Sequence, residues 1–212
     1  MSQGSDSALH NILMERIHIQ RESFRLSPPI VHRTFDNAWG AAVRVSRLLH
    51  PCPKGLLEWW RAQPSGHIIL THLTTQYCEG PQEVRGQTVH GAARLKMLDL
   101  VSDATTTLKA IAALLDHLCG SAGAVGSGRL SDGLGATPKL QEVGERIQKY
   151  WSLRYLEDLM EQQNSRDYFA TALSLYLLRR QELEVADPAI YRLLRTSLMA
   201  ELFWKQLRRD SS

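Results

Sequence analysis

The chain has 212 residues, 43% of them hydrophobic and 22% charged, and this composition excludes a disordered, collagen-like or disulfide-scaffold protein. Its formal net charge of +3 is too small for a protein that coats nucleic acid by charge alone. Residues 1–66 carry eight basic and five acidic side chains, residues 67–187 twelve and fifteen, and residues 188–212 five and two. The two ends are therefore basic and the middle is acidic.

The cysteines and the hydropathy pattern point to one compartment. The chain has three cysteines, Cys52, Cys78 and Cys119. Their odd number and their spacing do not match the disulfide framework of a secreted protein. The N-terminus lacks a signal-peptide pattern, and no run reaches the roughly 18 apolar residues of a membrane span. We therefore expect a soluble, cytoplasmic protein that makes no contact with a membrane.

Three helices are predicted in the first third of the chain. The apolar stripe that starts at Leu9 predicts a helix over residues 7–24, and a proline pair follows it. A second stripe predicts a helix over residues 34–50. A shorter helix is expected over residues 56–63, between two proline-containing segments.

Residues 67–78 fit two structures. Every second residue from Ile69 to Tyr77 is apolar or β-branched, as in a strand, while Ile69, Leu73 and Tyr77 also share a helix face. A lone strand is marginally stable, and only residues 87–90 offer a nearby partner. We favour a helix here and keep the strand as the alternative.

The clearest helical pattern covers residues 97–118. Its apolar residues recur at alternating spacings of four and three, which gives three heptads of a and d positions. They are Met97, Val101, Ala104, Leu108, Ile111, Leu115 and Leu118. Such a seam predicts a helix buried at the centre of a bundle.

A glycine-rich segment follows this helix. Residues 120–135 hold six glycines and three serines, a composition that buries little and loses much backbone entropy on folding. We expect a flexible loop over residues 120–137. It separates an N-terminal helical half, residues 1–119, from a C-terminal three-helix half, residues 138–212, unless the whole chain is one continuous domain.

The last third predicts three helices, over residues 138–163, 165–185 and 188–209. Asp187 followed by proline is a start signal, because it combines an N-cap with proline at the first helical position. Together the elements predict an all-α fold, a bundle of six to eight helices, either continuous or as two helical halves joined by the glycine-rich loop.

No group of residues has the spacing of a catalytic or metal site. The glycines after residue 119 follow a helix and lack the Gly-Lys-Ser/Thr ending of a phosphate loop. The set His50, Cys52, His72 and Cys78 matches no familiar zinc spacing. His117 lies about 200° around the helix from Cys119, so this pair cannot work as base and nucleophile. We expect no enzymatic activity, no cofactor and no metal ion.

Trp59 and Trp60 are the candidate partner-binding residues. Adjacent side chains on a helix diverge by about 100°, so both cannot easily enter one core. One of the two is then an exposed anchor for a protein partner, unless it packs against a neighbouring loop.

Basic residues near the C-terminus suggest a second kind of partner. Aromatic residues lie between them, as on surfaces that track phosphates, although a solvated helix face has the same composition. The candidates are Arg179, Arg180, Arg192, Arg195, Lys205, Arg208 and Arg209.

The sequence thus predicts a non-enzymatic interaction subunit or adaptor of a larger assembly, with a protein partner or self-association. The alternative is a nucleic-acid-binding regulator, or an accessory subunit of a nucleoprotein complex, that uses its basic terminal segments.

Overall fold

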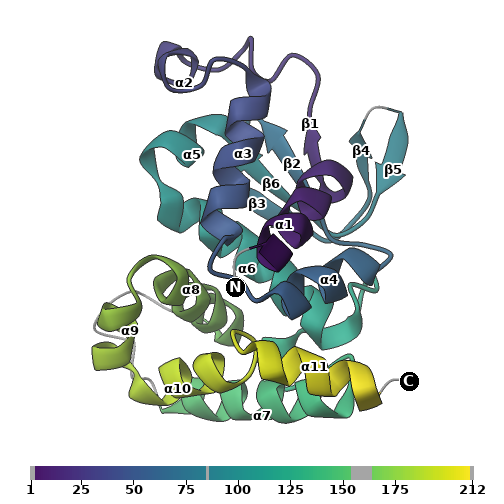
Figure 1. Ribbon diagram of the computed structural model, residues 1–212, viewed down its shortest axis with the longest axis vertical. Coiled ribbons are helices and arrows are strands. Elements are labelled where there is room, and N and C mark those ends of the chain that lie inside the picture. The colour runs from purple at the N-terminus through teal and green to yellow at the C-terminus, as the bar shows by residue number, and fades with distance from the viewer. Residues whose placement is uncertain (1–2, 85, 154–163, 211–212) are drawn as a thin grey trace.

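The structure has a mixed α/β fold, so the expected all-α helical bundle is wrong (Figure 1). It is a computed structural model that describes residues 3–84, 86–153 and 164–210. Within these residues, eleven α-helices and one 3₁₀ helix accompany a four-stranded sheet and a two-stranded hairpin.

The four-stranded sheet has the order β1-β2-β6-β3. Its strands are β1 (Ile17–Ile19), β2 (His67–Thr71), β6 (Ala92–Lys96) and β3 (Gln76–Cys78). The first three are parallel, with Ile68 opposite both Ile17 and Ala93. β3 is antiparallel to β6 and places Tyr77 opposite Ala93, so it forms one edge of the sheet. The separate hairpin joins β4 (Gln82–Val84) to β5 (Gln87–Val89).

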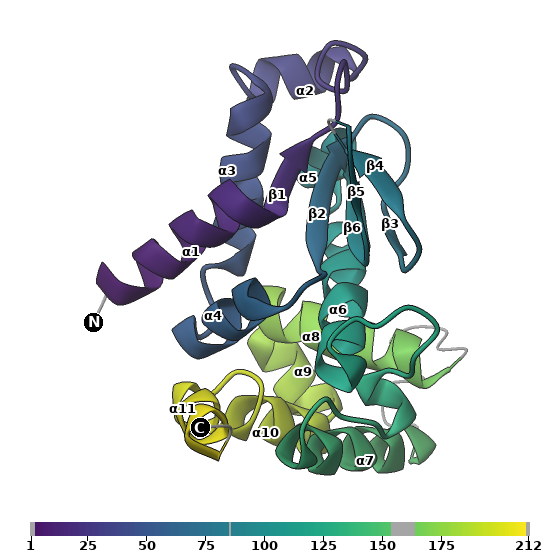
Figure 2. The ribbon, with the colours of Figure 1, turned by 90° about the vertical axis from the view of Figure 1, so that its right-hand side faces the viewer.

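The two faces of the sheet have different partners. Successive residues of a strand point to opposite faces. Ile68 and Leu70 of β2 belong to the main hydrophobic core that the helices share, whereas Ile69 packs with Val84 and Val89 of the hairpin. The helices that contact the sheet therefore lie against one face, and the hairpin packs on the other (Figure 2).

Four helices come from the first third of the chain. They are α1 (Gln3–Arg16), α2 (Pro29–Thr34), α3 (Ala38–Leu49) and α4 (Lys54–Ala62). α3 begins where the Asn37 side chain accepts hydrogen bonds from the amides of Trp39 and Gly40. Trp60 of α4 is completely buried and donates its indole N–H to the Gly66 carbonyl, which ties the helix to the start of β2.

The expected helix over residues 97–118 is interrupted at Asp103. α5 (Met97–Ser102) ends there, and α6 (Ala104–Ser121) begins with the Asp103 carboxylate accepting from the Thr106 amide. α6 is buried along most of its length, because it lies between the sheet and α8 (Ser165–Leu178). Central burial was the part of the heptad prediction that is confirmed.

The remaining elements form a layer at the lower end of the view in Figure 1. They are η1 (Leu130–Asp132), α7 (Pro138–Ser152), α8, α9 (Arg180–Ala186), α10 (Pro188–Thr196) and α11 (Glu201–Asp210). The predicted start at residues 187–188 is confirmed, with Asp187 as N-cap and proline at the first position. Residues 154–163 of the expected helix lie outside the described residues. No described helix has both the length and the apolar character that a bilayer crossing requires.

The helix favoured over residues 67–78 is wrong, because β2 and β3 form strands there as in the alternative, and β1 lies within the helix expected over residues 7–24. Both errors have a physical reason. β2 is central and buried on both faces, so its apolar residues run on without the clear alternation of a half-exposed strand. Its neighbours β1 and β6 are distant in sequence, and residues 87–89 pair with β4 instead. β1 has only three residues and directly follows α1. It is therefore too short to change the helical periodicity of the apolar residues that begin at Leu9.

Candidate functional site

A groove of about 510 Å³ runs beside the edge strand β3, between this strand and helices α6 and α8. Residues 75–77 form one wall. The lining from the helices consists of Thr106, Lys109, Ala110 and Ala113 of α6, and Arg166, Asp167 and Ala170 of α8. The three alanines are small, which leaves room for side chains of a bound molecule.

β3 and α6 run in the same direction along this groove. Thr75, just before β3, donates to the Asp99 carboxylate in α5, close to where α6 begins (2.6 Å). Two residues later, Tyr77 reaches His117 near the end of α6.

The backbone of β3 offers hydrogen-bonding groups at the outer edge of the sheet. In an antiparallel ladder, opposed residues alternate between pairs that exchange two hydrogen bonds and pairs that exchange none. The Gly91 amide donates to the Glu79 carbonyl (3.1 Å), so Glu79 and Gly91 form a hydrogen-bonded pair. By the alternation, Tyr77 and Ala93 form the next such pair. The N–H and C=O groups of Gln76 and Cys78 consequently point away from β6, to the edge of the sheet.

Tyr77 and His117 form the centre of a polar network at one end of the groove. The Tyr77 hydroxyl donates to Nδ1 of His117 over 2.5 Å, and Nε2 of His117 donates to the Ala124 carbonyl over 3.0 Å. Burial lowers the pKa of His117, opposed by Glu79, and burial raises the pKa of Tyr77. The imidazole is thus neutral with its proton on Nε2, and the phenol keeps its proton.

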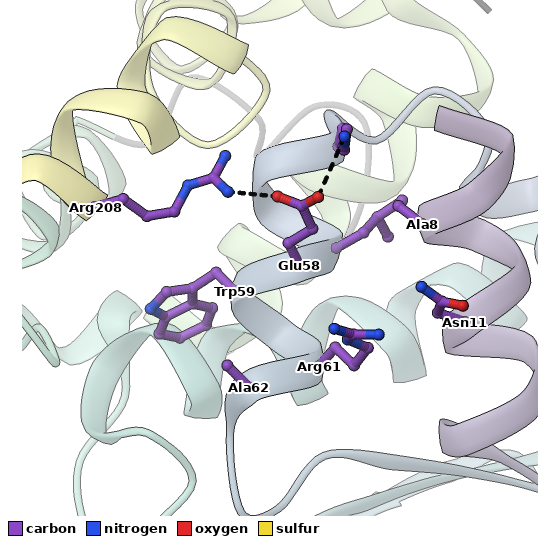
Figure 3. Close-up of a pocket in the computed structure, with 9 residues that line it drawn as sticks. Ala8, Asn11, Glu58, Trp59, Arg61, Ala62 and Arg208 are labelled. Atoms are coloured by element: carbon purple, nitrogen blue, oxygen red, sulfur yellow. Dashed lines mark hydrogen bonds and ion pairs between the residues drawn. The ribbon is translucent and has the colours of Figure 1, made fainter. Parts of the chain in front are cut away.

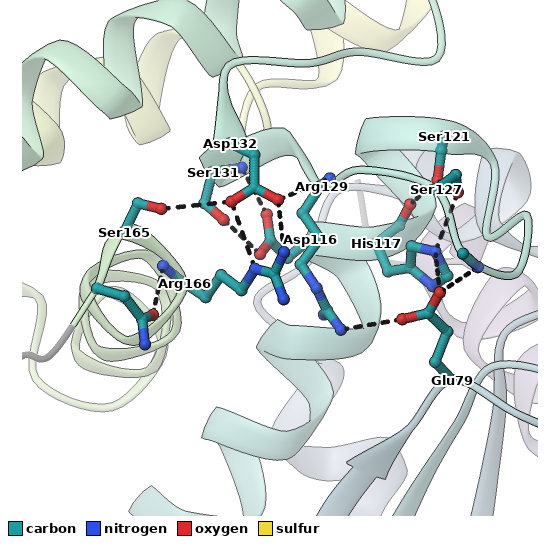
Figure 4. Close-up of polar contacts among 12 residues, drawn as sticks. Glu79, Asp116, His117, Ser121, Ser127, Arg129, Ser131, Asp132, Ser165 and Arg166 are labelled. Atoms are coloured by element: carbon teal, nitrogen blue, oxygen red, sulfur yellow. Dashed lines mark hydrogen bonds and ion pairs between the residues drawn. The ribbon is translucent and has the colours of Figure 1, made fainter.

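Glu79 and Arg129 connect this centre to the segment after α6 (Figure 4). Glu79, which follows β3, accepts from the Gly126 amide (2.6 Å) and lies 3.5 Å from the Arg129 guanidinium. Arg129 also donates to the Ala113 carbonyl and stacks over the Tyr77 ring at 5.0 Å. These contacts tie the glycine-rich segment to β3 and α6.

A second set of contacts holds η1 against α6 and α8. The buried carboxylate of Asp116 accepts from the amide and the hydroxyl of Ser131, at 2.8 and 2.6 Å. Burial raises the pKa of Asp116 to about 7, although the two bonds from Ser131 oppose the shift. Asp132 pairs with Arg166 over 2.9 Å, so η1 also positions one wall of the groove (Figure 4).

The polar side chains at this end of the groove are bonded to one another and to the backbone. Both ring nitrogens of His117 are engaged, so His117 has no free nitrogen with which to act as a general base. Burial raises the pKa of the Cys52 thiol to about 12 and raises that of Cys119 as well, so both thiols stay protonated. Among the described residues, no group of three or more His, Cys, Asp or Glu side chains is placed to hold a metal ion.

The two tryptophans of the sequence prediction lie in different environments. Trp60 is fully buried, so a partner at the surface cannot reach it. Trp59 is half-buried and packs against Trp204 with the two rings tilted and their centroids 5.4 Å apart. It lines a shallow pocket between α1, α4 and α11, together with Glu58, Arg61 and other residues (Figure 3).

The basic C-terminal residues divide between two places. Arg179, Arg180, Arg192 and Arg195 lie at α8–α10, and Lys205, Arg208 and Arg209 lie on α11. The Arg180 guanidinium covers the Tyr176 ring at 4.5 Å, and Arg195 covers Tyr191 at 5.7 Å. Arg208 pairs with Glu58 at the Trp59 pocket (Figure 3).

Sequence reasoning missed the groove because its walls come from distant segments. One local signal was present: Asp116 and His117 interrupt the most apolar helix of the chain. Buried polar groups require partners, so this pair marks a place where another segment must supply donors and acceptors. Periodicity alone could not show that the partners are Tyr77 and Ser131.

Comparison with known proteins adds no family. No family model, no curated protein and no solved structure matches this chain.

Proposed function

We propose that this protein is a non-enzymatic adaptor that binds an extended segment of a partner protein along β3. The observation that carries the proposal is the outward-facing backbone of Gln76 and Cys78 beside the groove. An extended peptide can add to such an edge by continuing the ladder, with its alternate side chains directed to the groove floor. We place the interaction in the cytoplasm, where unpaired cysteines stay reduced.

The geometry limits what can bind. Three strand residues span about 10 Å at roughly 3.3 Å per residue, so about three residues of an extended peptide can pair with β3 directly. Each new backbone hydrogen bond contributes about 1 kcal/mol net, so the alanine-lined floor must add apolar contact for useful affinity. We expect dissociation constants on the order of micromolar.

The test starts from a displayed library of random heptapeptides selected on the immobilised full chain. Affinity of a selected peptide is then measured by fluorescence polarisation, with each peptide amide N-methylated in turn. Amides that bond to β3 face it at every second position, so methylation should abolish binding at alternate residues only. Equal sensitivity at adjacent amides, or none at all, would contradict strand addition.

Variants of β3 provide the matched control. Gln76→Pro removes the outward N–H and should weaken binding at least tenfold, whereas Gln76→Thr keeps the N–H and should leave it unchanged. Circular dichroism confirms that both variants fold. If β3 instead pairs with β3 of a second copy, sedimentation will show a dimer that Gln76→Pro dissociates, and the proposal of a separate partner fails.

A nucleic-acid-binding function is the second candidate, and one surface favours it. Arg180, Tyr176, Tyr191 and Arg195 form a continuous stack, because the two tyrosine rings are 5.7 Å apart and each carries a guanidinium. The rings are buried, so this surface would contact phosphates and leave bases unstacked.

This candidate is tested by salt dependence. Binding of a fluorescein-labelled dodecamer of thymidine is measured at 50 and 200 mM salt. Phosphate contacts predict a steep loss of affinity with salt, and the double variant Arg180→Glu/Arg195→Glu should remove binding. Absence of binding at 50 mM would eliminate this function.

A further inference from the structure

A second groove, of about 390 Å³, lies between α3 and α5, on the left side of the view in Figure 1. It shares no lining residue with the groove beside β3, so binding here does not depend on strand addition. Its apolar floor consists of Phe35, Val43, Leu100 and Val101. The two valines are half-buried and supply the apolar surface that a bound molecule can reach. Gly40 has no side chain, so such a molecule can approach the α3 backbone closely there.

Charged side chains are distributed unevenly along this groove. Arg44 and Arg47 lie one helical turn apart on α3, toward its C-terminal end, and both line the groove. Among the residues that the structure describes, neither guanidinium forms a hydrogen bond, an ion pair or a ring contact. Asp36 lines the groove at the N-terminal end of α3, just before the Asn37 cap. The groove is therefore positive at one end and negative at the other, with one positive charge in excess.

The wall that α3 provides offers no row of free backbone groups, unlike the edge of β3. Its lining residues lie within the helix, where N–H and C=O groups bond along the same helix or to its cap. An extended peptide would turn backbone groups toward this wall without a partner, which is unfavourable where water is excluded. A helix pairs its backbone groups internally and presents only side chains, so it avoids this cost.

We propose that this groove docks an amphipathic helix of a protein partner, with its acidic side chains on Arg44 and Arg47 and its apolar stripe on the floor. The two arginines are separated by a rise of about 4.5 Å along α3, which matches acidic residues three or four positions apart on a facing helix. Acidic residues favour the first turn of a helix and basic residues the last turn. A partner helix antiparallel to α3 therefore places its acidic end on the arginines and its basic end near Asp36.

The charges set the orientation of the partner helix, and the apolar floor supplies most of its affinity. Arg44 is half-buried and Arg47 is exposed, so each ion pair with a partner contributes only modestly. Among the described residues that line the groove, Asp36 alone carries a carboxylate, and it lies away from the arginines. A carboxylate of the partner therefore displaces no ion pair when it reaches Arg44 or Arg47.

The experiment is a displayed library of 15-residue helical peptides, randomised on one face and selected on the immobilised full chain. Affinities of fluorescein-labelled binders are measured by fluorescence polarisation at 50 and 200 mM salt. We expect two acidic residues one turn apart in the N-terminal half, beside an apolar stripe. Replacing both by glutamine should weaken binding about fivefold to tenfold at 50 mM salt, and less at 200 mM salt.

Charge reversal on the protein locates the binding site. The double variant Arg44→Glu/Arg47→Glu should weaken binding about tenfold or more, and lysines in place of the two acidic peptide residues should restore affinity for this variant. Arg21→Glu/Arg209→Glu is the matched control, because both side chains are exposed and lie outside the groove, and the net charge changes equally. Circular dichroism confirms that both variants fold.

Several results would overturn the proposal. Peptides that respond equally to the two double variants would bind elsewhere, and a library without binders would exclude a helix site. A thymidine dodecamer that binds at 50 mM salt and is lost in Arg44→Glu/Arg47→Glu would assign the arginines to phosphates instead. Gln76→Pro should leave helix binding unchanged, so a failure here is distinguishable from a failure of strand addition at β3.

Discussion

Tyr77 and His117 fix each other's protonation state. The phenol must donate because burial keeps it protonated, and the imidazole must accept on Nδ1 because its other nitrogen donates to a carbonyl. The hydrogen bond between the two side chains joins β3 to α6. This rigidity positions the wall of the groove near Tyr77.

Loss of the Tyr77 hydroxyl should therefore lower the stability of the folded protein. In Tyr77→Phe, Nδ1 of His117 stays buried without a donor, so we expect a loss of about 1–3 kcal/mol in the free energy of unfolding. Urea denaturation measures it. Tyr150→Phe removes a longer, exposed bond from Arg146 and should change stability by less than about 0.5 kcal/mol. Equal effects of the two variants would show that the buried bond contributes nothing.

Both ends of the glycine-rich segment pack closely against other parts of the fold. Its backbone runs so close to α6 that a Cβ on Gly120 would lie 2.4 Å from the main chain of Arg129 and Leu130. The Ala136 amide returns to the Cys119 carbonyl (2.8 Å), and the Ser65 hydroxyl donates to the Ala122 carbonyl (3.2 Å). The absence of a side chain at Gly120 allows the backbone of residues 129–130 to lie directly against α6.

The corresponding prediction concerns Gly120→Ala. The added methyl group meets backbone that cannot rotate away, so η1 must shift from α6, and we expect a loss of about 2 kcal/mol or more in unfolding free energy. Thermal denaturation measures it. Gly80→Ala is the control, because no atom lies within 4 Å of the added Cβ. A Gly120→Ala protein as stable as Gly80→Ala would mean that the segment does not pack on α6 as described.

Helical elements were predictable where one face is polar and the ends carry caps. The helices expected from residues 138 and 188 satisfy both conditions and begin there, although the one expected over residues 188–209 is divided into α10 and α11. Periodicity alone could not decide for the strands, because residues 67–78 fit a helix as well as a strand and β2 acquires its partners only through tertiary contacts. The groove depends on those strands, so its position could not be derived from periodicity.

At the scale of the whole molecule, pH acts on stability through the sum of its titrating groups. Burial lowers the pKa of His67 to about 4, aided by the charges of Arg16, His18 and His90. This histidine contributes stability above its unfolded pKa that is lost as the pH falls. Asp116 acts in the opposite sense, because its pKa rises from 3.8 to about 7 on folding.

The contribution of Asp116 can be isolated by difference. Between about pH 4 and pH 7 the folded protein holds a proton on Asp116 that the unfolded chain has already released. The stability that this proton contributes is fully present below about pH 4 and is lost as the pH rises to about 7. Asp116→Asn mimics the protonated carboxyl group at every pH. Urea unfolding at pH 4.5, 6 and 8 should show that the wild type loses stability relative to Asp116→Asn as the pH rises. Parallel curves would contradict the raised pKa.

The most direct test of the binding mode is amide hydrogen exchange of β3, followed by NMR with and without a selected heptapeptide. The amide of Tyr77 bonds to β6 and should be protected in both states, whereas those of Gln76 and Cys78 should exchange quickly alone and slowly with peptide. Unchanged exchange at Gln76 and Cys78 in the saturated complex would show that the peptide does not extend the sheet.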